Sequence, residues 1–511
     1  MATCSRGVLM SNLCGVVAIQ LKDLWSLFFT VLPKVLCLPA RFLLKKFQKD
    51  EHVHPPAIEL ETAVGTLPEL PHDVLMSIFA TLEIPDLLRA GSVCSSWRSA
   101  YTCLRDLGKY KQSQTPYLLY TSPAAGENVA CLYSLAEKRA YKITLPEPPI
   151  RTRSLIGSSN GFLITADERS ELHLVNPITG EQIALPSVIT IEHVRPIYYG
   201  SGTISKYELS FHSADPDEKR WTELHAPNKL REDFYFKAFV FPDPSTGSYI
   251  VVLIHHPHFQ LSFARAGDKE WTWLPHGTEY SDCVYMDGLL YALKADGEID
   301  AFDLTGSTVT MRVVIGSLKF IYESMYIIQA PWGDLLQVWR TVDKPSSRLY
   351  YIDDVSEGED EDVLEREGED DDATEEEGED DDATEGEDEN DDDTEKRDIS
   401  CTLNIKVYKV DMEAKELVKI RSLPNHMLFL GRNNSLCLSA HGHPKLKSNH
   451  AYLTDDRDQT ITLINYYPRD IGIWDFENSS KKEIVSQIWS NWPCPTWITP
   501  SLMKLNLAFS K

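Results

Sequence analysis

The first clear pattern of apolar positions lies between residues 67 and 105. Within LPELPHDVLMSIFATL, apolar residues recur at steps of four, one, three, one and three, from Leu70 to Leu82. This spacing places one apolar stripe along a helix. Pro71 lies where a first-turn proline is tolerated, because the amide hydrogen that it lacks would have no partner there. The pattern therefore predicts a helix over Leu70–Leu82.

A second helix is predicted after a short break. Pro85 disfavours helical geometry at the residue before it, so Glu83-Ile84-Pro85 interrupts the period. Asp86 is expected to cap the next helix. The apolar positions of that helix are Leu87, Leu88, Val93 and Trp97. The result is a helical hairpin or three-helix unit of about 40 residues, near the size below which domains seldom fold alone. It carries more bulky apolar side chains than so small a unit can hide, which calls for a partner.

These residues resemble the F-box, the segment by which substrate receptors of cullin-RING ubiquitin ligases dock onto a Skp-type adaptor. The match lies within residues 66–108 and consists of Leu70-Pro71, Asp73, Leu75, Ile78-Phe79, Leu82, Asp86-Leu87-Leu88-Arg89, Val93-Cys94 and Trp97-Arg98. The resemblance implies adaptor contacts from Leu70, Pro71, Val74, Leu75, Ile78, Phe79 and Leu82 on the first helix, with Leu87, Leu88 and Val93 on the second. Val74 stands where leucine is commoner, and Trp97 is expected to pack inside the unit. The alternative is an ordinary helical hairpin packed on the rest of the chain.

From Tyr117 onward the pattern changes to short apolar or aromatic runs broken by Gly, Asn, Asp and Pro. Such runs are typical of strands joined by tight turns. Examples are Tyr117–Tyr120, Gly161–Thr165, Glu171–Val175, Tyr249–Ile254, Leu289–Leu293 and Ile299–Leu304. No amphipathic segment of ordinary helix length interrupts them before the acidic run. The sequence therefore predicts an all-β domain.

Some of these runs recur in one sequence pattern: a strand, a polar turn, a second strand and then Leu-Pro or a near equivalent. The turns of this pattern are Asn176–Gly180, Asp215–Lys219, Gly267–Lys269 and Met412–Lys415. One hairpin cannot bury its own face, whereas several stacked around an axis can. A hairpin that recurs at intervals of roughly 40–50 residues, or multiples of that, favours the blades of a β-propeller. The repeat is too degenerate to give the number of blades.

Other short sequence segments resemble the KIB-type β-propeller domain of plant F-box proteins, long classed as a domain of unknown function. They are Leu428–Ser435, Asn449–Asp456, Ile473–Asp475 and Trp492–Pro500, with Ser159–Gly161 and Asn176-Pro177 upstream. The resemblance extends over residues 117–350 and 400–500 and implies that the propeller holds a target protein, through residues that remain unknown. The expected fold class is α+β and multidomain, a small all-α F-box followed by an all-β propeller-like domain with a disordered acidic insertion.

The charge of the chain is concentrated in that insertion. Residues 353–398 hold 29 of the 77 acidic residues and 3 of the 50 basic ones, a net charge of −26 out of −27. The block repels itself and lacks apolar residues to bury, so we predict that it is disordered. It lies between the strand-like runs 350–352 and 401–403 and is expected to be a loop, whose closure entropy grows only slowly with length. It is either a tether for a basic partner, such as a histone-like tail, or a low-complexity expansion that aids solubility.

Residues 1–65 are predicted to be an apolar and basic extension followed by a linker. Their longest uncharged runs, Gly7–Leu21 and Leu24–Pro33, are shorter than the ~20 residues that a spanning helix needs. Leu24–Lys46 is compatible with a membrane-surface helix or a targeting segment, but prolines break its helical period. A poorly ordered extension is the alternative. The ten cysteines include no CxxC pair, which favours a reducing compartment, the cytoplasm and/or the nucleus.

The motifs of catalytic and metal sites are mostly missing. Gly157–Gly161 matches G-x-S-x-G, but that elbow needs a helix after the serine, and a strand-like run follows here. The histidines at 255, 256, 258, 441 and 443 have no Cys, Asp or Glu partner at the spacing of a zinc site. The globular part has no basic stripe for nucleic acid. We therefore predict no enzyme, catalytic residue, metal site, cofactor or nucleic-acid partner.

The sequence supports one main hypothesis for the function. The chain would be the substrate-receptor subunit of an SCF-type ubiquitin ligase, with an F-box at residues 66–108 and a propeller at residues 117–352 and 399–505. Its partners would be a Skp-type adaptor, a cullin bound through that adaptor, and an unknown target protein. The alternatives are a membrane-tethered or acidic scaffold protein without a ligase role and, further, a propeller hydrolase.

Overall fold

The computed structural model describes residues 70–200, 202–211, 221–243, 246–274, 277–306, 308–318, 323–342, 402–456, 469–484 and 492–503. The chain divides into two compact units, residues 1–112 and 113–511. The predicted extension at 1–65 and the predicted acidic insertion at 353–398 lie outside the described residues. Within the ranges given above, no helix has the length and apolar character of a membrane span.

The described part of the first unit consists of three helices, α2 (His72–Phe79), α3 (Ile84–Ala90) and α4 (Ser95–Asp106). The first lies where it was predicted, although Pro71 precedes its first residue instead of lying in its first turn. Of the two predicted arrangements, the three-helix unit is confirmed and the hairpin is wrong, because the chain leaves α3 after Ala90 and is extended at Cys94 before α4 begins. Asp86 does not cap α3. Glu83 holds that position, and Asp86 lies inside α3, 2.5 Å from the Arg89 guanidinium.

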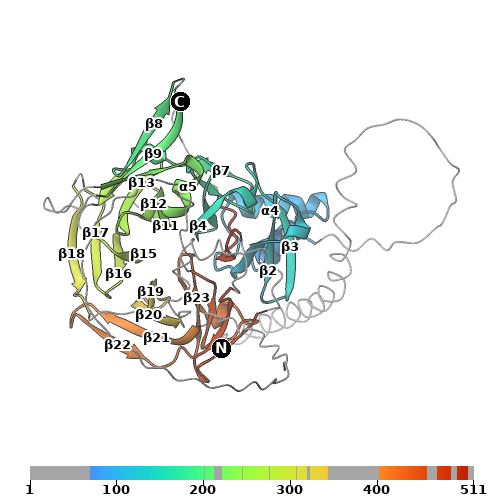
Figure 1. The fold of residues 1–511 in the computed structure, drawn as a ribbon. Helices are drawn as coiled ribbons and strands as arrows, with labels where there is room; N and C mark the ends of the chain where they lie inside the picture. The colour runs from blue at the N-terminus through green and yellow to red at the C-terminus, as the bar shows by residue number, and fades with distance from the viewer. Residues whose placement is uncertain are drawn as a thin grey trace, which may run out of the picture. The chain divides into compact units, whose positions relative to one another are not determined.

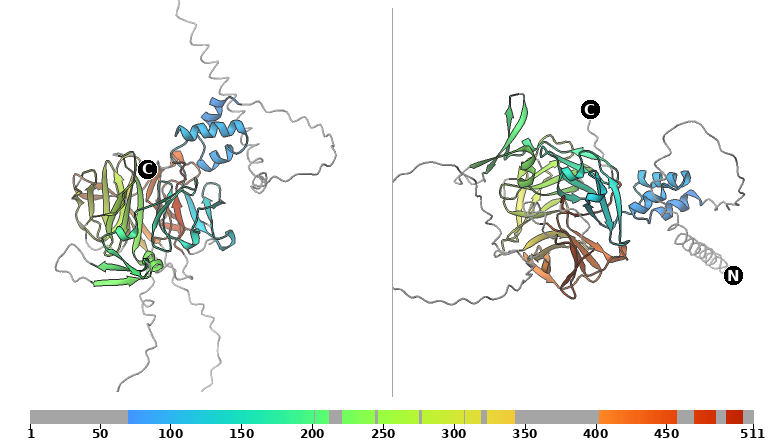
Figure 2. Two further views of the ribbon diagram at one scale, coloured as in Figure 1. Left: turned by 90° about the horizontal axis from the view of Figure 1, so that it is seen from above. Right: turned by 45° about the vertical axis from the view of Figure 1, so that its right-hand side comes forward.

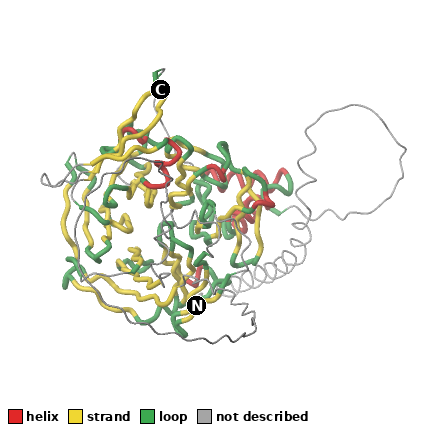
Figure 3. Tube along the Cα trace, in the orientation of Figure 1, coloured by secondary structure: helices red, strands yellow, loops and turns green. Residues whose placement is uncertain are grey.

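In the described part of the second unit most of the regular secondary structure is strand, which Figure 3 shows in yellow. Six sheets of four or five strands, here called blades 1 to 6, follow one another around a common axis (Figure 1). Blade 1 consists of β28 (Thr496–Ile498), β1 (Tyr117–Thr121), β2 (Val129–Ser134) and β3 (Arg139–Thr144); blade 2 of β4 (Ser154–Ser159), β5 (Phe162–Ala166), β6 (Leu172–Val175) and β7 (Gln182–Ala184); and blade 3 of β11 (Tyr235–Asp243), β12 (Ser248–His255), β13 (Gln260–Arg265) and β14 (Thr272–Leu274).

The other three blades follow in the same way. Blade 4 consists of β15 (Tyr280–Met286), β16 (Leu289–Lys294), β17 (Ile299–Asp303) and β18 (Thr310–Ile315); blade 5 of β19 (Ser324–Gln329), β20 (Leu335–Val342), β21 (Thr402–Asp411) and β22 (Glu416–Ile420); and blade 6 of β24 (Leu436–Ser439), β23 (His426–Leu430), β25 (His450–Leu453), β26 (Gly472–Asp475) and β27 (Ser480–Lys482). All six strand runs named from the sequence are strands here, and the predicted fold class of a small helical unit followed by an all-β propeller-like domain is confirmed.

Six apolar clusters close the ring, one between each pair of neighbouring blades. Side chains from blades 5 and 6, for example, share one cluster that includes Val338, Val407, Leu428 and Trp474. Each blade buries one face against the next, which no single hairpin can do. The described residues thus form six blades, a number that could not be predicted from the sequence.

A seventh sheet stands outside the ring. It consists of β8 (Val194–Tyr199), β9 (Thr203–Phe211) and β10 (Trp221–His225), and the short helix α5 (Pro227–Asp233) follows it. Figure 2 shows its β8–β9 hairpin projecting from the propeller. The sequence did not predict α5, because seven residues are too few to establish a helical period. Tyr207 and Leu209 join the cluster between blades 2 and 3, so the sheet is anchored there.

The recurring polar turns have a shared physical cause. In each of three hairpins, the side-chain oxygen of an Asn or Asp accepts hydrogen bonds from backbone amides two and three residues ahead, which folds the turn locally. Asn176 does so before β7, Asp411 before β22 and Asp475 before β27. Three turns of the pattern predicted from the sequence, Asn176–Gly180, Gly267–Lys269 and Met412–Lys415, therefore belong to the outer hairpins of blades 2, 3 and 5. The fourth, Asp215–Lys219, lies outside the described residues.

The first blade is completed by the last described strand. β28 pairs with β1 in antiparallel register, with Leu118 opposite Trp497. The indole of Trp497 is 1% exposed and meets the ring of Phe429 edge-on, with centroids 5.3 Å apart. The two ends of the propeller sequence are thus joined in one sheet, which fixes the ring as a closed structure.

Candidate functional site

The helical unit has its own small core, which takes up three of the ten predicted adaptor contacts. Leu75, Phe79 and Leu87 are each at most 1% exposed. Phe79 also meets Trp97 edge-on, with ring centroids 5.3 Å apart. These three side chains hold α2, α3 and α4 together, so we reassign them from adaptor binding to the packing of the unit. Trp97 packs against that core, as the sequence analysis expected.

The other seven predicted contacts keep solvent-accessible apolar surface, and we call them the accessible apolar set. They are Leu70, Pro71, Val74, Ile78, Leu82, Leu88 and Val93. On α2 the buried pair Leu75 and Phe79 and the accessible pair Val74 and Ile78 are each four residues apart, so the helix carries two neighbouring apolar stripes. One stripe faces the unit's own core and the other remains available. Val93 is 45% exposed.

In the propeller, a segment of blade 6 closes the centre of the ring. The backbone N–H of Asn434 donates to the Ser158 carbonyl of blade 2 at 2.7 Å, and the Ser435 hydroxyl donates to Asp282 of blade 4 at 3.2 Å. Neither blade is a neighbour of blade 6, so residues 431–435 cross the axis. Gly431 is required at the start of this segment, because its φ is +150° and a Cβ there would meet the Thr454 hydroxyl.

A buried ion pair lies beside that crossing. Lys237 on β11 and Asp282 on β15 are 2.9 Å apart, and Asp282 also accepts from the backbone N–H of Ile327 at 3.0 Å. Burial raises the pKa of the Asp282 carboxyl, and the attraction of Lys237 offsets part of that effect. The pair joins blades 3, 4 and 5 near the axis.

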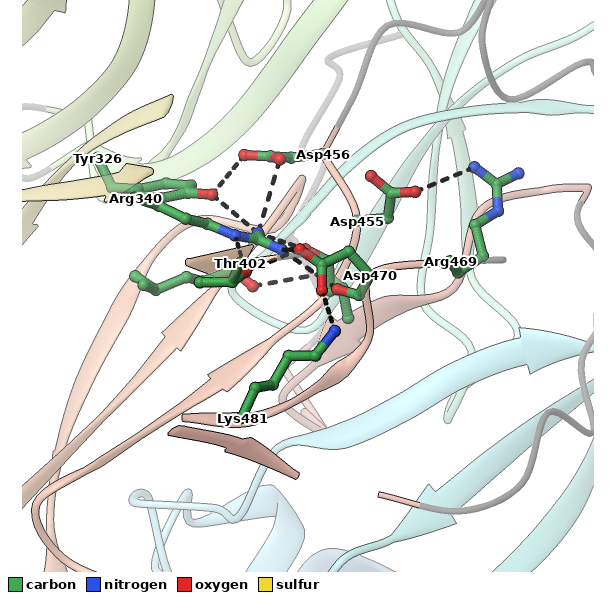
Figure 4. A network of polar contacts seen from close by, with 10 residues as sticks. Tyr326, Arg340, Thr402, Asp455, Asp456, Arg469, Asp470 and Lys481 are labelled. Atoms are coloured by element: carbon green, nitrogen blue, oxygen red, sulfur yellow. Dashed lines mark hydrogen bonds and ion pairs between the residues drawn. The ribbon is translucent and has the colours of Figure 1, made fainter. Parts of the chain in front are cut away.

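Figure 4 shows a second buried network, the Arg340 cluster, formed by Tyr326, Arg340, Thr402, Asp456, Asp470 and Lys481. The Arg340 guanidinium donates to Asp470 Oδ2 at 2.8 Å, to the Thr402 hydroxyl at 2.9 Å and to the Thr454 carbonyl at 2.8 Å. Asp470 also accepts from Thr402 at 2.7 Å and from Lys481. The cluster joins the end of β20 to the start of β21 and to the residues before β26, so it connects blade 5 to blade 6.

The charges in this cluster predict how stability depends on pH. Burial alone would raise the pKa of the Asp470 carboxyl, but the attractions of Arg340 and Lys481 lower it below its usual value. The network therefore contributes stability that is present above the unfolded pKa of about 3.9 and is lost as pH falls through the lower folded pKa. Urea unfolding between pH 6 and 3 should show a steeper loss in the wild type than in Asp470→Asn. If the free energy of unfolding fell equally with pH in both proteins, Asp470 would not be ionised in the folded state.

A groove opens at the outer side of the same two blades. It has a volume of about 410 Å³ and runs between the β21–β22 hairpin of blade 5 and the β26–β27 turn of blade 6. Trp474, Phe476 and Ile420 belong to the apolar cluster between these blades or pack against it. The charged residues that line it are Lys406, Lys419 and Arg421. Its volume lies within the range of sites that receive ligands, and its lining combines apolar and basic side chains.

The residues whose sequence patterns suggested catalysis have structural roles in the propeller. Ser159 of the G-x-S-x-G match ends β4, a two-residue turn follows, and β5 begins at Phe162, so a blade hairpin stands where an elbow would need a helix. Its hydroxyl donates to the Val240 carbonyl at 2.6 Å. Burial lowers the pKa of His255 to about 3, so this imidazole is neutral and hydrogen-bonds with the Ser262 hydroxyl. No group of three metal-ligating side chains occurs among the described residues.

Several of the interactions described above were not predicted from the sequence, although the sequence contains a signal for them. Lys237, Asp282 and Arg340 are the single charged residues of the mainly apolar or aromatic runs YFKAFVF, YSDCVYM and LLQVWRTV. A charge in such a run is buried only if a partner neutralises it. That signal predicts a buried ion pair, but it does not name the partner, because the partners lie on other blades.

Comparison with known proteins agrees with this geometry. Residues 67–103 match the F-box-like family model, and residues 132–475 match the model described as the KIB1-4 beta-propeller, which covers most of the chain.

Relatives come from Arabidopsis thaliana. The F-box protein SKIP23 is 25% identical over 84% of this chain and 95% of its own length. F-box only protein 7 is 27% identical over 46% of this chain, and F-box protein KIB4 is 25% identical over 47%. The chain spans 57% and 60% of the lengths of these last two proteins. It belongs to the plant F-box proteins that carry a KIB1-4 β-propeller.

Proposed function

We propose that this chain is the substrate-receptor subunit of an SCF-type ubiquitin ligase. The observation that carries the proposal is the accessible apolar set on the F-box. The three helices already have a core of their own, and yet Val74 and Ile78 keep a second apolar stripe on α2 accessible. Burial of such a stripe by a Skp-type adaptor is favourable in proportion to the apolar area covered.

In this role the chain contributes binding and not chemistry. The propeller holds a target protein, and the adaptor connects the chain to a cullin and to the subunits that transfer ubiquitin. The receptor raises the effective concentration of a target lysine near the transferring enzyme, which accelerates the reaction without a cofactor. The buried and hydrogen-bonded state of Ser159 and His255 supports a scaffold role for both residues.

The test is capture of a purified Skp-type adaptor by the full-length chain. The double variant Val74→Asp plus Ile78→Asp should weaken capture by about 100-fold or more, because two carboxylates would have to be buried without partners. Leu75→Asp is unsuitable, since Leu75 lies in the core of the F-box and its replacement would unfold the helices.

A matched control adds the same charge to an exposed polar surface of the unit. Ser77 and Ser99 are exposed, and the double variant Ser77→Asp plus Ser99→Asp should capture the adaptor as the wild type does. Circular dichroism should show equal helix content in both double variants. Wild-type capture by the Val74 and Ile78 variant would refute the receptor role.

A further inference from the structure

The groove between blades 5 and 6 combines three features. It is apolar at its base, basic in its lining and adjacent to a free strand edge. The base belongs to the core that joins the two blades, where Trp474 is buried while Ile420 and Phe476 remain partly accessible. An apolar side chain placed there would extend the existing core.

The charge of the lining is of one sign. Of the twelve residues that line the groove, three are basic and none is acidic. Lys406 lies 3.2 Å from Glu323, so its charge is compensated. Lys419 and Arg421 are exposed and stand on either side of Ile420 along the chain. Outside residues 353–398 the chain is nearly neutral, so this one-signed lining is not a consequence of the overall composition.

The third feature is the edge of blade 5. β22 is the outermost strand of that blade, and one of its sides has no strand neighbour in the described part of the chain. Such an edge offers backbone N–H and C=O groups to an extended segment. The groove residues 419–423 include the end of this strand. An extended peptide therefore fits the edge better than a compact anion does.

The shape of the groove is held by the Arg340 cluster. Arg340 and Thr402 of blade 5 both hydrogen-bond with Asp470, which lies four residues before Trp474 of blade 6. Asn404 of the groove lining lies two residues after Thr402 in β21. The walls of the groove are therefore joined at one end by a buried ion pair, and the site is present before any ligand binds. Preorganisation of this kind lowers the entropy that binding costs.

We propose that this groove binds an extended, acidic segment of the target protein, with an apolar side chain on Ile420 and Phe476 and carboxylates beside Lys419 and Arg421. The proposal rests on the receptor role and names the class of target that the receptor takes. The chemistry selects a peptide in which apolar and acidic residues alternate. Such a segment places its apolar side chains on one face of the strand and its carboxylates on the other.

The experiment measures binding by fluorescence anisotropy to the full-length chain. The probe is a fluorescein-labelled peptide of alternating glutamate and leucine. The comparison peptides replace either glutamate by glutamine or leucine by serine. A parallel sample carries a glycine–serine linker of equal length in place of residues 353–398, so that the chain's own carboxylates do not compete for the groove.

The double variant Lys419→Glu plus Arg421→Glu should weaken binding of the glutamate–leucine peptide by about tenfold. Its matched control is Lys445→Glu plus Lys447→Glu, which makes the same change of charge at two exposed lysines that do not line the groove. The control should bind as the wild type does. Both comparison peptides should bind more weakly, and about 0.5 M salt should reduce the affinity because exposed charges are then screened.

Three outcomes would overturn the proposal. They are an absence of peptide binding by the wild type, an equal loss in the groove variant and its control, and equal binding of the leucine and serine peptides. Adaptor capture by the groove variant separates this proposal from the receptor role. The F-box is unchanged in that variant, so capture should equal that of the wild type even if the groove binds nothing.

Discussion

Replacing Arg340 with methionine should lower the free energy of unfolding of the propeller by about 3–5 kcal/mol. The guanidinium is 1% exposed, and its loss would leave Asp470 and the Thr454 carbonyl buried without their main donor. Methionine fills a similar volume but donates no hydrogen bond, so the effect reports the lost charge and not a cavity. Urea unfolding followed by tryptophan fluorescence measures it.

The control for this variant is Arg312→Met. Arg312 is exposed on β18, the outer strand of blade 4. A surface change of this kind should alter the free energy of unfolding by less than about 0.5 kcal/mol. If Arg340→Met lowered the free energy of unfolding as little as Arg312→Met, the Arg340 cluster would not hold blades 5 and 6 together. Other contacts would then have to fix the geometry of the groove.

Replacing Trp497 with alanine should be as damaging, at about 3–5 kcal/mol. The indole lies in the cluster between blades 6 and 1, against Phe429 and Tyr452. Among the strands that the structure describes, only β28 pairs with the side of β1 that faces away from β2 in blade 1. Removal of the indole leaves a cavity at the closure of the ring. The midpoint of urea unfolding should therefore move to lower denaturant without a change in slope.

Trp332→Ala is the matched control for that prediction. The same residue type is removed, but Trp332 lies in the turn between β19 and β20 and is 42% exposed. Its indole N–H donates to Asp334 at 2.7 Å, and its loss should cost about 1 kcal/mol or less. Equal effects of the two substitutions would mean that closure through β28 does not limit the stability of the propeller.

The parts of the fold that were predicted correctly depend on local patterns. The apolar period of α2 and the six strand runs can be read within a few residues, and turns such as Asn176–Gly180 carry their own hydrogen-bond acceptor. Pro85 was expected to lie in a break between two helices, but it lies in the first turn of α3. A proline is tolerated in the first turn of a helix, so α3 begins at Ile84, and a separate helix starts after Cys94.

The parts that were missed depend on contacts between distant segments. Sequence spacing gives Val74 and Leu75 the same apolar character, and only the packing of α4 decides which of them is buried. In the same way, nothing near Arg340 in the sequence points to Asp470, which is brought to it by the neighbouring blade. The groove is also formed by two blades, so no single stretch of the chain contains it.

The position of β28 has a consequence for how the protein is made. Blade 1 begins at Tyr117 but receives its fourth strand only from Thr496–Ile498. During synthesis the F-box helices are complete long before that strand leaves the ribosome, and domains generally fold in the order in which they emerge. A prematurely terminated chain would therefore carry a finished F-box and an open ring with unpaired edges. Under the proposed receptor role, such a product would occupy the adaptor without being able to deliver a target.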